Sequence, residues 1–229
     1  MKLNVDFLGR IDYKEALELQ GQILILRQKK KIENTLLILE HPPVITLGRR
    51  GVHSNIIAPA AELDANGIRI YEVSRGGDVT YHGPGQIVGY PIIDLKEINK
   101  GIKEFVWGIE ELFIRLLKNE FDIAARRDEK KYTGVWVGDD KITAIGIAVK
   151  HWVTMHGFAF NVNTNLEHFR WINPCGITDR GVTSLEKLLG CSQDLDRLNK
   201  IIADYFCEQF DFEPEIIDRR NSWESVRSG

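Results

Sequence analysis

The sequence lacks the marks of a membrane, secreted or metal-binding protein. No apolar run approaches the roughly 18 residues that cross a bilayer, and the first six residues contain no apolar block of a signal peptide. Only three cysteines are present, so they cannot all pair, and no C-x-x-C unit marks a zinc site. We therefore expect a cytoplasmic protein with reduced thiols, without a bound metal and without membrane contact.

An excess of positive charge is also missing. The formal net charge is −3, whereas a protein that binds duplex nucleic acid needs surplus Lys and Arg to neutralise phosphates, so we expect no nucleic-acid partner. Two local basic clusters remain. Arg49 and Arg50 are candidates for docking one acidic protein. The cluster at residues 126–131 is interrupted by Asp128 and Glu129, and solvated surface charge explains it equally well.

Phosphate-binding motifs are absent as well. The sequence contains no G-x-x-x-x-G-K-[ST] loop. Gly83-Pro84-Gly85 does not fit the dinucleotide pattern, because Gly89 comes one residue late. We therefore expect neither a nucleotide nor another cofactor.

Length and periodicity predict one α+β domain that spans residues 1–229. The hydrophobic content of 43% supplies a sizeable core, and no repeat, linker or low-complexity segment divides the chain. Because short strands are clustered and irregularly interleaved with helices, we expect a central mixed β-sheet with flanking helices. Apolar residues at helical spacing predict helices over residues 12–30, 105–117, 184–189 and 195–210. Short apolar runs predict strands over residues 35–39, 44–47, 68–73, 87–93, 135–137, 141–149 and 155–162.

The most informative segment is the glycine-rich stretch RGGDVTYHGPGQ at residues 75–86. Its glycines let the main chain reach positive φ and approach a ligand closely. Apolar runs flank both ends, so we interpret the stretch as one turn whose polar groups face a substrate. The competing interpretation is a flexible surface loop.

Cys175 is the candidate nucleophile, and it lies in the irregular turn INPCGI. A thiol with a pKa of about 8.5 is only a few per cent thiolate at neutral pH, so it needs a nearby cation. Lys141 opens an apolar strand and is a candidate for a partly desolvated amine coupled to such a thiol. Two alternatives stay open: Cys175 is a small buried hydrophobe, and Lys141 ends a turn in water. Cys191 and Cys207 lie on helix-like segments and are predicted to be structural.

Small residues indicate a site for an apolar chain. Ala144, Gly146 and Ala148 share one face of their strand, and Gly157 and Ala159 share one face of the next. If these strands pair about a turn at residues 151–154, Gly146 lies opposite Ala159 and Ala148 lies opposite Gly157. The result is a shallow trough, which we interpret as an acyl site. Close strand packing under a helix is the alternative.

His82 and His156 are the remaining titratable candidates. Each is suited either to orienting a thiol or a carbonyl or to a purely structural role. We interpret the other histidines as structural, and Phe169 and Trp171 as core residues.

Five blocks occur in order along the sequence: HPPV with TLGR at residues 41–49, the glycine-rich stretch, KITAIG at 141–146, HGFAFNVN at 156–163 and INPCG at 172–176. Together these blocks resemble the lipoyl(octanoyl) transferase family, the octanoyl-[acyl carrier protein]:protein N-octanoyltransferases. Lys141 and Cys175 both occupy their motif positions. The resemblance implies a fold like that of the biotin and lipoate protein ligases.

The resemblance further implies an acyltransferase of lipoate biosynthesis that needs no ATP. Cys175 would carry the acyl thioester, and Lys141 would tune the thiol and shuttle protons. The implied donor is octanoyl-acyl carrier protein, and the implied acceptors are lipoyl domains of 2-oxoacid dehydrogenase complexes and the glycine cleavage H protein. The implied substrate-binding residues are Arg75, Gly76, Gly77, Asp78, Val79, Thr80, Tyr81, His82, Ala144, Ile145, Gly146, Gly157, Phe158 and Ala159.

Three other functions stay open. An ATP-dependent lipoate ligase resembles the same fold and also uses a lysine, but Cys175 argues against it. A ligase would also show His-Asp after a serine- and glycine-rich loop, where this chain has His82-Gly83. A thioester hydrolase differs only in letting water reach the acyl-enzyme. A non-enzymatic module would bind acylated carrier protein and leave Cys175 inert.

Overall fold

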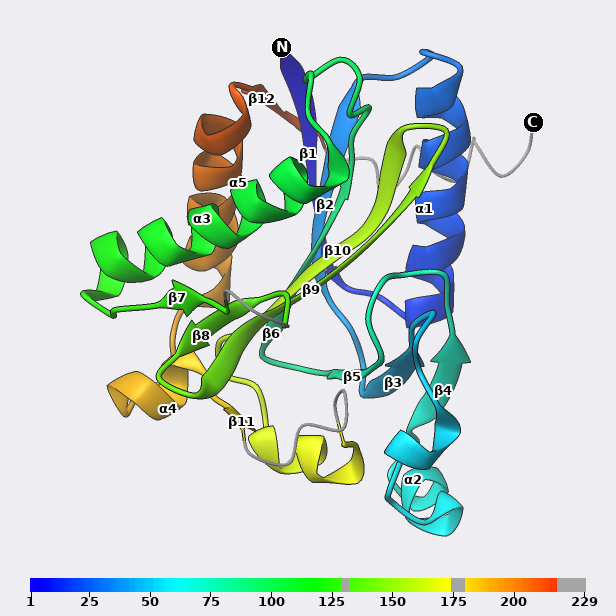
Figure 1. Cartoon of the computed structure of the whole chain (residues 1–229), viewed down its shortest axis with the longest axis vertical. Helices are drawn as coiled ribbons and strands as arrows, with labels where there is room; N and C mark the ends of the chain where they lie inside the picture. Colours follow the sequence, from blue (N-terminus) through cyan, green and yellow to red (C-terminus); the bar gives the residue numbers. More distant parts are fainter. Residues whose placement is uncertain (129–131, 174–179, 218–229) are drawn as a thin grey trace.

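In the computed structural model, which describes residues 1–128, 132–173 and 180–217, two β-sheets form the centre of the molecule (Figure 1). The larger sheet has the order β12-β1-β2-β6-β10-β9-β8-β7, and β11 pairs with β9. β12, β1 and β2 run parallel, whereas the pairs from β2 to β7 are antiparallel, so the sheet is mixed as predicted. Its strands are β1 (Lys2–Arg10), β2 (Asn34–Glu40), β6 (Gln86–Ile92), β7 (Arg126–Arg127), β8 (Val135–Val137), β9 (Asp140–Lys150), β10 (Val153–Asn161), β11 (Gly181–Val182) and β12 (Glu213–Ile217).

The smaller sheet contains part of the glycine-rich stretch. β3 is parallel to β4 and antiparallel to β5. The prediction that residues 75–86 form one turn is therefore wrong. The β-branched and aromatic residues in the middle of this stretch form β5, which separates two glycine segments. The strands of this sheet are β3 (Val44–Leu47), β4 (Arg69–Glu72) and β5 (Val79–His82).

Helices cover both faces of the larger sheet (Figure 1). α1 (Tyr13–Gln28) packs against β6 and β10, and the Asp12 side chain caps its first turn. α3 (Ile102–Phe121) and α5 (Leu195–Phe210) pack on each other and bury the opposite face. The shorter helical elements are α2 (Ala60–Ala65), α4 (Leu185–Leu189), and the 3-10 turns His53–Asn55 and Leu166–Trp171.

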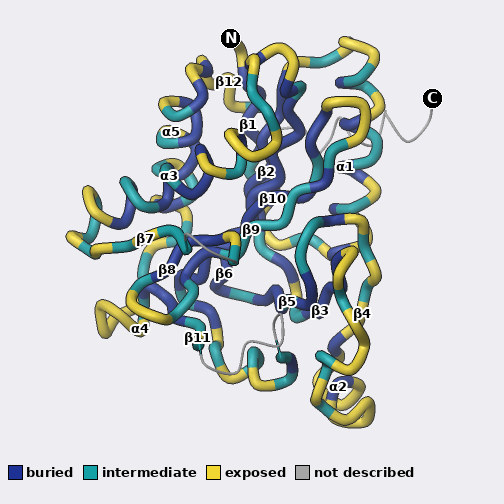
Figure 2. The backbone as a smooth tube through the Cα atoms, in the orientation of Figure 1, coloured by how far each residue is buried: buried dark blue, intermediate teal, exposed yellow. Residues whose placement is uncertain are grey.

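Alternation along the strands divides the core between these two layers. In β2, Leu36 and Ile38 pack with the side chains of α3 and α5, whereas Leu37 and Leu39 pack with those of α1. Successive side chains of a strand point to opposite faces, so one short apolar run supplies both layers. The central strands are accordingly buried along most of their length (Figure 2). These features confirm the predicted α+β class. Across the described residues, none of the helices combines the length and the apolar character that crossing a membrane requires.

The hairpin of β9 and β10 has a different register from the predicted one. Gly146 lies opposite Gly157 and Ala144 opposite Ala159, which is a shift of two residues. The turn consists only of His151 and Trp152, both with positive φ (50° and 69°), so Lys150 already pairs with Val153. Two-residue turns with positive φ fit the twist of paired strands but favour Asn and Gly, and this sequence offers neither.

Candidate active site

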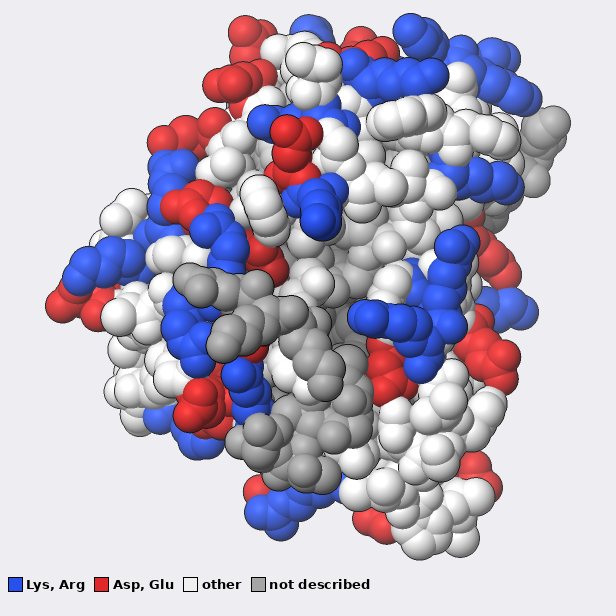
Figure 3. All heavy atoms as spheres, viewed as in Figure 1, with Lys and Arg blue, Asp and Glu red and all other residues white. Residues whose placement is uncertain are grey.

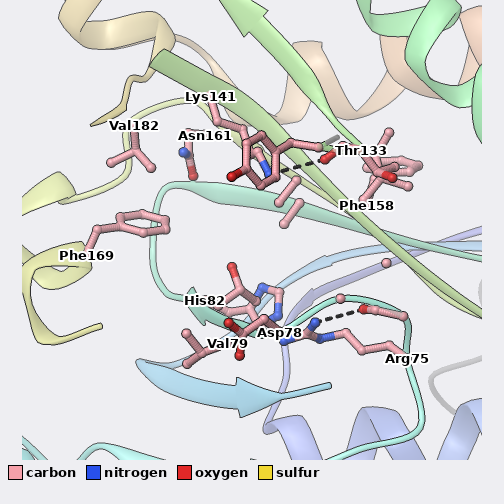
Figure 4. A pocket seen from close by; sticks show the side chains of 18 of the residues that line it. Arg75, Asp78, Val79, His82, Thr133, Lys141, Phe158, Asn161, Phe169 and Val182 are labelled. Atoms are coloured by element: carbon pink, nitrogen blue, oxygen red, sulfur yellow. Dashed lines mark hydrogen bonds between the residues drawn. The ribbon is translucent and has the colours of Figure 1, made fainter. Parts of the chain in front are cut away.

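A cavity of about 630 Å³ lies between the glycine-rich stretch on one side and β9 and β10 on the other. In Figure 4, Arg75, Asp78 and His82 lie across the cavity from Lys141. Every predicted substrate-binding residue except Tyr81 lines it. These residues are Arg75, Gly76, Gly77, Asp78, Val79, Thr80 and His82, then Ala144, Ile145 and Gly146 of β9, and Gly157, Phe158 and Ala159 of β10. That they bind substrate stays a prediction.

Tyr81 faces away from the cavity. Its side chain is buried in the core under the smaller sheet, and its hydroxyl lies 2.6 Å from His168 Nδ1. Tyr81 alternates with His82 along β5, and adjacent side chains of a strand point to opposite sides. Trp171 packs on the same core as predicted, whereas Phe169 both packs there and lines the cavity.

Cys175 lies outside the described residues, as does the rest of the segment 174–179. The described residues on either side of this segment, Asn173 and Arg180, both line the cavity. Ile172 lines it as well, and it forms an isolated bridge with Ile56.

Lys141 is half-buried in the cavity wall. Its Nζ donates a hydrogen bond to the Thr133 carbonyl oxygen at 3.1 Å and lies 4.8 Å from the centre of the Trp136 ring. The Arg180 guanidinium lies 5.0 Å from the same ring and pairs with Asp128. Two cations therefore meet at one buried indole, which makes this part of the wall electropositive.

Arg75 is buried and serves the scaffold. Its Nε and Nη2 both donate to the Thr46 side-chain oxygen at 3.1 and 2.9 Å, and Nη2 also donates to the Thr46 carbonyl at 2.7 Å. We predicted polar groups that face a substrate. Arg75 does border the cavity, but these hydrogen bonds attach the part of the glycine-rich stretch that precedes β5, residues 75–78 (the glycine segment), to β3.

Asp78 presents an unsatisfied carboxylate oxygen. One oxygen accepts a hydrogen bond from Asn55 Nδ2 at 2.6 Å, while the other is buried without a hydrogen-bond partner among the described residues. Asp78 is also the only acidic side chain among the described lining residues, whereas six of them are cationic: Arg50, Arg75, Lys141, Arg170, Arg180 and Lys187. A buried, unpaired carboxylate oxygen is costly, so this position suits a donor from a substrate.

His82 is held as a neutral imidazole. The Gln86 amide donates through Nε2 to the Tyr81 carbonyl at 3.2 Å and to Asn161 Oδ1 at 2.9 Å, so its Oε1 faces His82 Nδ1 at 2.8 Å. His82 Nδ1 must therefore donate, and Nε2 carries the lone pair. Burial lowers the pKa of His82 to about 3, and the neighbouring His41 adds to this effect.

His41 lies behind His82, with ring centroids 5.8 Å apart. Its Nδ1 donates to the Ile11 carbonyl at 2.8 Å, so its Nε2 accepts from the Tyr90 hydroxyl at 2.7 Å. Burial lowers the pKa of His41 to about 4. His156 lies within β10 and has a φ of 57°, yet it still pairs with Ile147 of β9; its Nε2 lies 3.2 Å from Ser74 Oγ. Burial lowers the pKa of His156 to about 4 as well.

The sequence did not reveal Tyr13, Tyr90, Trp136 and Arg180 as lining residues. Each lies in an ordinary apolar or charged context, and only the packing of distant elements brings them together. In the part of the chain that the structure describes, no group of three His, Cys, Asp or Glu side chains is arranged to hold a metal ion.

Comparison with known proteins decides the family. The model of the family described as "Lipoyl protein ligase A/B catalytic domain" matches residues 12–207. The chain belongs to this family. An octanoyltransferase of Desulforamulus reducens is 60% identical over 226 residues, which is 99% of both chains. An octanoyltransferase of Caldicellulosiruptor saccharolyticus is 58% identical and covers 99% of this chain and 97% of its own. With such relatives, this member of the family is an acyltransferase.

Solved structures agree on the fold. Lipoate-protein ligase A bound with ATP superimposes with a TM-score of 0.77 at 16% identity, covering 100% of this chain and 94% of that chain. A bi-partite lipoate protein ligase of Thermoplasma acidophilum, described with its E2 lipoyl domain, superimposes with a TM-score of 0.74 at 17% identity. The match covers 100% of this chain and 91% of that chain. Biotin protein ligase of Aquifex aeolicus superimposes with a TM-score of 0.52 at 12% identity, and the match covers 92% of this chain and 69% of that chain. The biotin and lipoate protein ligase-like fold is thereby confirmed.

Proposed function

We propose that the protein, acting as one catalytic domain, transfers an octanoyl or lipoyl group from acyl carrier protein to a lysine of lipoyl domains through a thioester on Cys175. One observation carries this proposal. Lys141, the glycine-rich stretch and the small residues of β9 and β10 line the same cavity as Asn173 and Arg180, which lie on either side of the Cys175 segment.

The reaction consists of two acyl transfers, one onto the Cys175 sulfur and one from it. The Cys175 thiolate attacks the carbonyl carbon of the donor thioester, and the carrier's thiolate leaves and takes a proton from the Lys141 ammonium. The acceptor lysine first gives its ammonium proton to solvent. The neutral amine then attacks the acyl-enzyme, forms an amide, releases the Cys175 thiolate and returns its second proton to Lys141. The first transfer replaces one thioester by another and the second forms a more stable amide, so neither step needs ATP.

The electropositive wall supports the nucleophile. Lys141 and Arg180 stabilise a thiolate over a thiol, because an opposite charge within a few ångströms favours the ionised form. Asp128 pairs with Arg180 and neutralises part of its charge.

The trough between β9 and β10 supports a place for the acyl chain. Ala144, Gly146, Gly157 and Ala159 form two opposed pairs on one face of the hairpin, and all four line the cavity. The Gly76 backbone packs on Gly146, so the acyl chain would lie beside this contact rather than across it. Burying seven carbons at about 0.8 kcal/mol each gives roughly 5 kcal/mol of binding free energy before ordering costs.

Intact-mass measurement tests the proposal. The protein is mixed with octanoyl-acyl carrier protein without nucleotide, and lipoyl domains and the glycine cleavage H protein are then added separately. We expect a hydroxylamine-labile octanoyl adduct that is absent in Cys175→Ser and that passes to the acceptor lysine. An adduct that decays to free octanoate at the same rate with or without acceptor indicates a hydrolase. Transfer that occurs only with ATP and free octanoate indicates a ligase, and binding without an adduct indicates a non-enzymatic module.

A further inference from the structure

Glu110 is a carboxylate in an apolar place. It lies on the buried face of α3 beside Ile109 and Phe113, and it is 4% exposed. Burial raises the pKa of Glu110, and the Gly134 hydrogen bond and the charges of Arg127 and Lys141 partly offset this rise. A buried carboxylate is costly unless its partners compensate, so what it touches indicates what it does.

Glu110 contacts the backbone just before β8 and the Arg127 side chain of β7. Its Oε1 accepts a hydrogen bond from the Gly134 main-chain N–H at 2.9 Å, and its Oε2 lies 3.4 Å from Arg127 Nε. Gly134 leads into β8 with a φ of 132°, and a Cβ at this position would lie 2.6 Å from the Thr143 carbonyl oxygen. This backbone is therefore held between α3 and β9.

The other end of the same peptide group holds Lys141. Thr133 O and Gly134 N belong to one amide plane: the carbonyl accepts from Lys141 Nζ at 3.1 Å while the N–H donates to Glu110. A carboxylate on the N–H side draws charge toward the carbonyl oxygen and strengthens the bond that this oxygen accepts. A Gly134 Cβ would also lie 3.3 Å from Lys141 Cε, so the lysine stem rests directly on this backbone.

We propose that Glu110 is a positioning residue for acyl transfer, which fixes the Thr133–Gly134 peptide so that its carbonyl holds the Lys141 ammonium in the cavity wall. The inference rests on the proposed role of Lys141. Glu110 is not among the residues that line the cavity, so it acts through the peptide rather than on the substrate.

The effect should appear in turnover rather than in substrate binding. We expect Glu110→Met, which removes the acceptor at similar volume, to lower kcat by about 10- to 100-fold, the range associated with small misplacement of a catalytic group. The acyl site is untouched, so KM should change by no more than about threefold. Glu110→Gln keeps an oxygen for the Gly134 N–H and should recover kcat to within about fivefold of the parent.

A second measurement reads Lys141 directly, without catalysis. Limited reductive methylation followed by peptide mass spectrometry gives the labelling rate of each lysine. Once its carbonyl partner moves, Lys141 should label several-fold faster in Glu110→Met and near the parent rate in Glu110→Gln. The matched control is Glu111→Met, because Glu111 is the next residue of the same helix, pairs with Arg127 and does not contact Gly134. It should behave like the parent in both measurements.

The outcomes separate this inference from the proposed function. Parent kcat and parent labelling in Glu110→Met overturn the positioning role. Equal losses in Glu110→Met and Glu110→Gln with unchanged Lys141 labelling also overturn it, because they indicate a merely structural residue. If the parent itself forms no acyl adduct, the proposed function fails, and the labelling rates still decide whether Glu110 positions Lys141. Thermal unfolding of each variant checks the fold, and if Glu110→Met does not fold, Glu110→Asp replaces it as the variant too short to reach Gly134.

Discussion

Gly146 and Gly157 lie directly opposite each other in the antiparallel pair of β9 and β10, and neither position has room for a side chain. A Cβ on Gly146 would lie 2.8 Å from the Gly76 carbonyl oxygen, and one on Gly157 would lie 1.9 Å from the Gly89 carbonyl oxygen. The Gly76 N–H also donates to the Ile147 carbonyl at 3.0 Å. The glycine segment thus rests on bare backbone of β9, and the cavity wall depends on that contact.

Substituting Gly146 by alanine should therefore disturb the site. The added methyl must push the Gly76 segment away, since the atom it meets is backbone and cannot rotate aside. We expect Gly146→Ala to lower octanoyl transfer at least about tenfold, in proportion to the displacement of substrate-contacting groups. Steady-state transfer to a lipoyl domain measures the effect.

Gly21→Ala is the matched control for this variant. Gly21 lies within α1, and nothing lies within 4 Å of an added Cβ. Replacing a helical glycine by alanine should leave transfer unchanged and stabilise the fold by about 0.5–1 kcal/mol. Full activity of Gly146→Ala would show that the contact between Gly76 and β9 does not shape the site.

The same hairpin shows where reasoning from sequence stops. Alternation of small and apolar residues predicted both strands and placed the small residues on one face. The register depends on a turn of His151 and Trp152 with positive φ, a conformation that is uncommon for residues other than glycine. No turn motif in the sequence indicates this two-residue turn, so the predicted strand register was wrong by two residues.

Other parts of the site were visible from sequence only as fragments. The glycine-rich stretch stood out because glycines and polar residues cluster there, and Lys141 stood out because it directly precedes an apolar run. Glu110 and Trp136 looked like ordinary members of a helix and a strand. Their importance comes from contacts between α3, β8 and β9, and the spacing within any one element carries no trace of such contacts.

Cysteine labelling should reveal the activating cation. We expect iodoacetamide at pH 7 to alkylate Cys175 rapidly in the parent and up to about tenfold more slowly in Lys141→Met, since a rise of one unit in a thiol pKa that lies above the assay pH lowers the thiolate fraction tenfold. Peptide mass spectrometry follows each thiol. The exposed Cys191 serves as the internal control, and Cys207 should resist because burial raises its pKa to about 11. Equal Cys175 rates in the two proteins would remove Lys141 from thiol activation.

Asp78 should matter for the acceptor. The target lysine carries a positive charge until it loses the proton that lets it attack. Asp78 is the one carboxylate among the described lining residues, and one of its oxygens has no hydrogen-bond donor within the described parts of the chain. We expect Asp78→Asn to raise KM for the lipoyl domain about tenfold, the size expected for loss of a charge-assisted hydrogen bond. Formation of the acyl-enzyme should be unchanged in single turnover. If Asp78→Asn slowed only the formation of the acyl-enzyme, Asp78 would instead act in binding the acyl donor.

The buried histidines should make the fold sensitive to acid. The pKa of His41 is about 4 in the folded protein and 6.5 in the unfolded chain. Between these pH values the unfolded chain therefore binds a proton at His41 that the folded protein does not bind. Stability is therefore greatest above pH 6.5 and falls as the pH drops toward 4. At pH 5 the loss from this one group is about 2 kcal/mol.

Urea unfolding at pH 7.5 and pH 5 measures this contribution by difference. His41→Gln should lose less stability than the parent between these two pH values, by about 2 kcal/mol. His53→Gln is the control, since His53 is exposed and its ion-pair partner among the described residues is the surface residue Glu72. An identical pH dependence in the parent and in His41→Gln would contradict the neutral, buried state of His41.

The basic turn at the cavity rim should recruit the acidic carrier protein. Arg49 N and Arg50 N donate to the Arg75 and Gly77 carbonyls at 3.0 Å each, so the turn is fixed to the glycine segment. Neither exposed side chain takes part in an ion pair with the described residues, and Arg50 lines the cavity. Figure 3 shows a group of Lys and Arg side chains on this face, over β3 and the loop between β4 and β5.

Reversing both charges should weaken capture of the donor without changing the chemistry. We expect Arg49→Glu/Arg50→Glu to raise KM for octanoyl-acyl carrier protein about 5- to 30-fold at low salt and to leave kcat unchanged, because rim charges act mainly on association. The difference should shrink at 0.5 M salt, where the screening length falls to about 4 Å. Lys29→Glu/Lys31→Glu makes the same charge change at the end of α1 distant from β3 (Figure 1) and should match the parent. If both double variants raise KM equally, overall charge rather than this turn determines carrier binding.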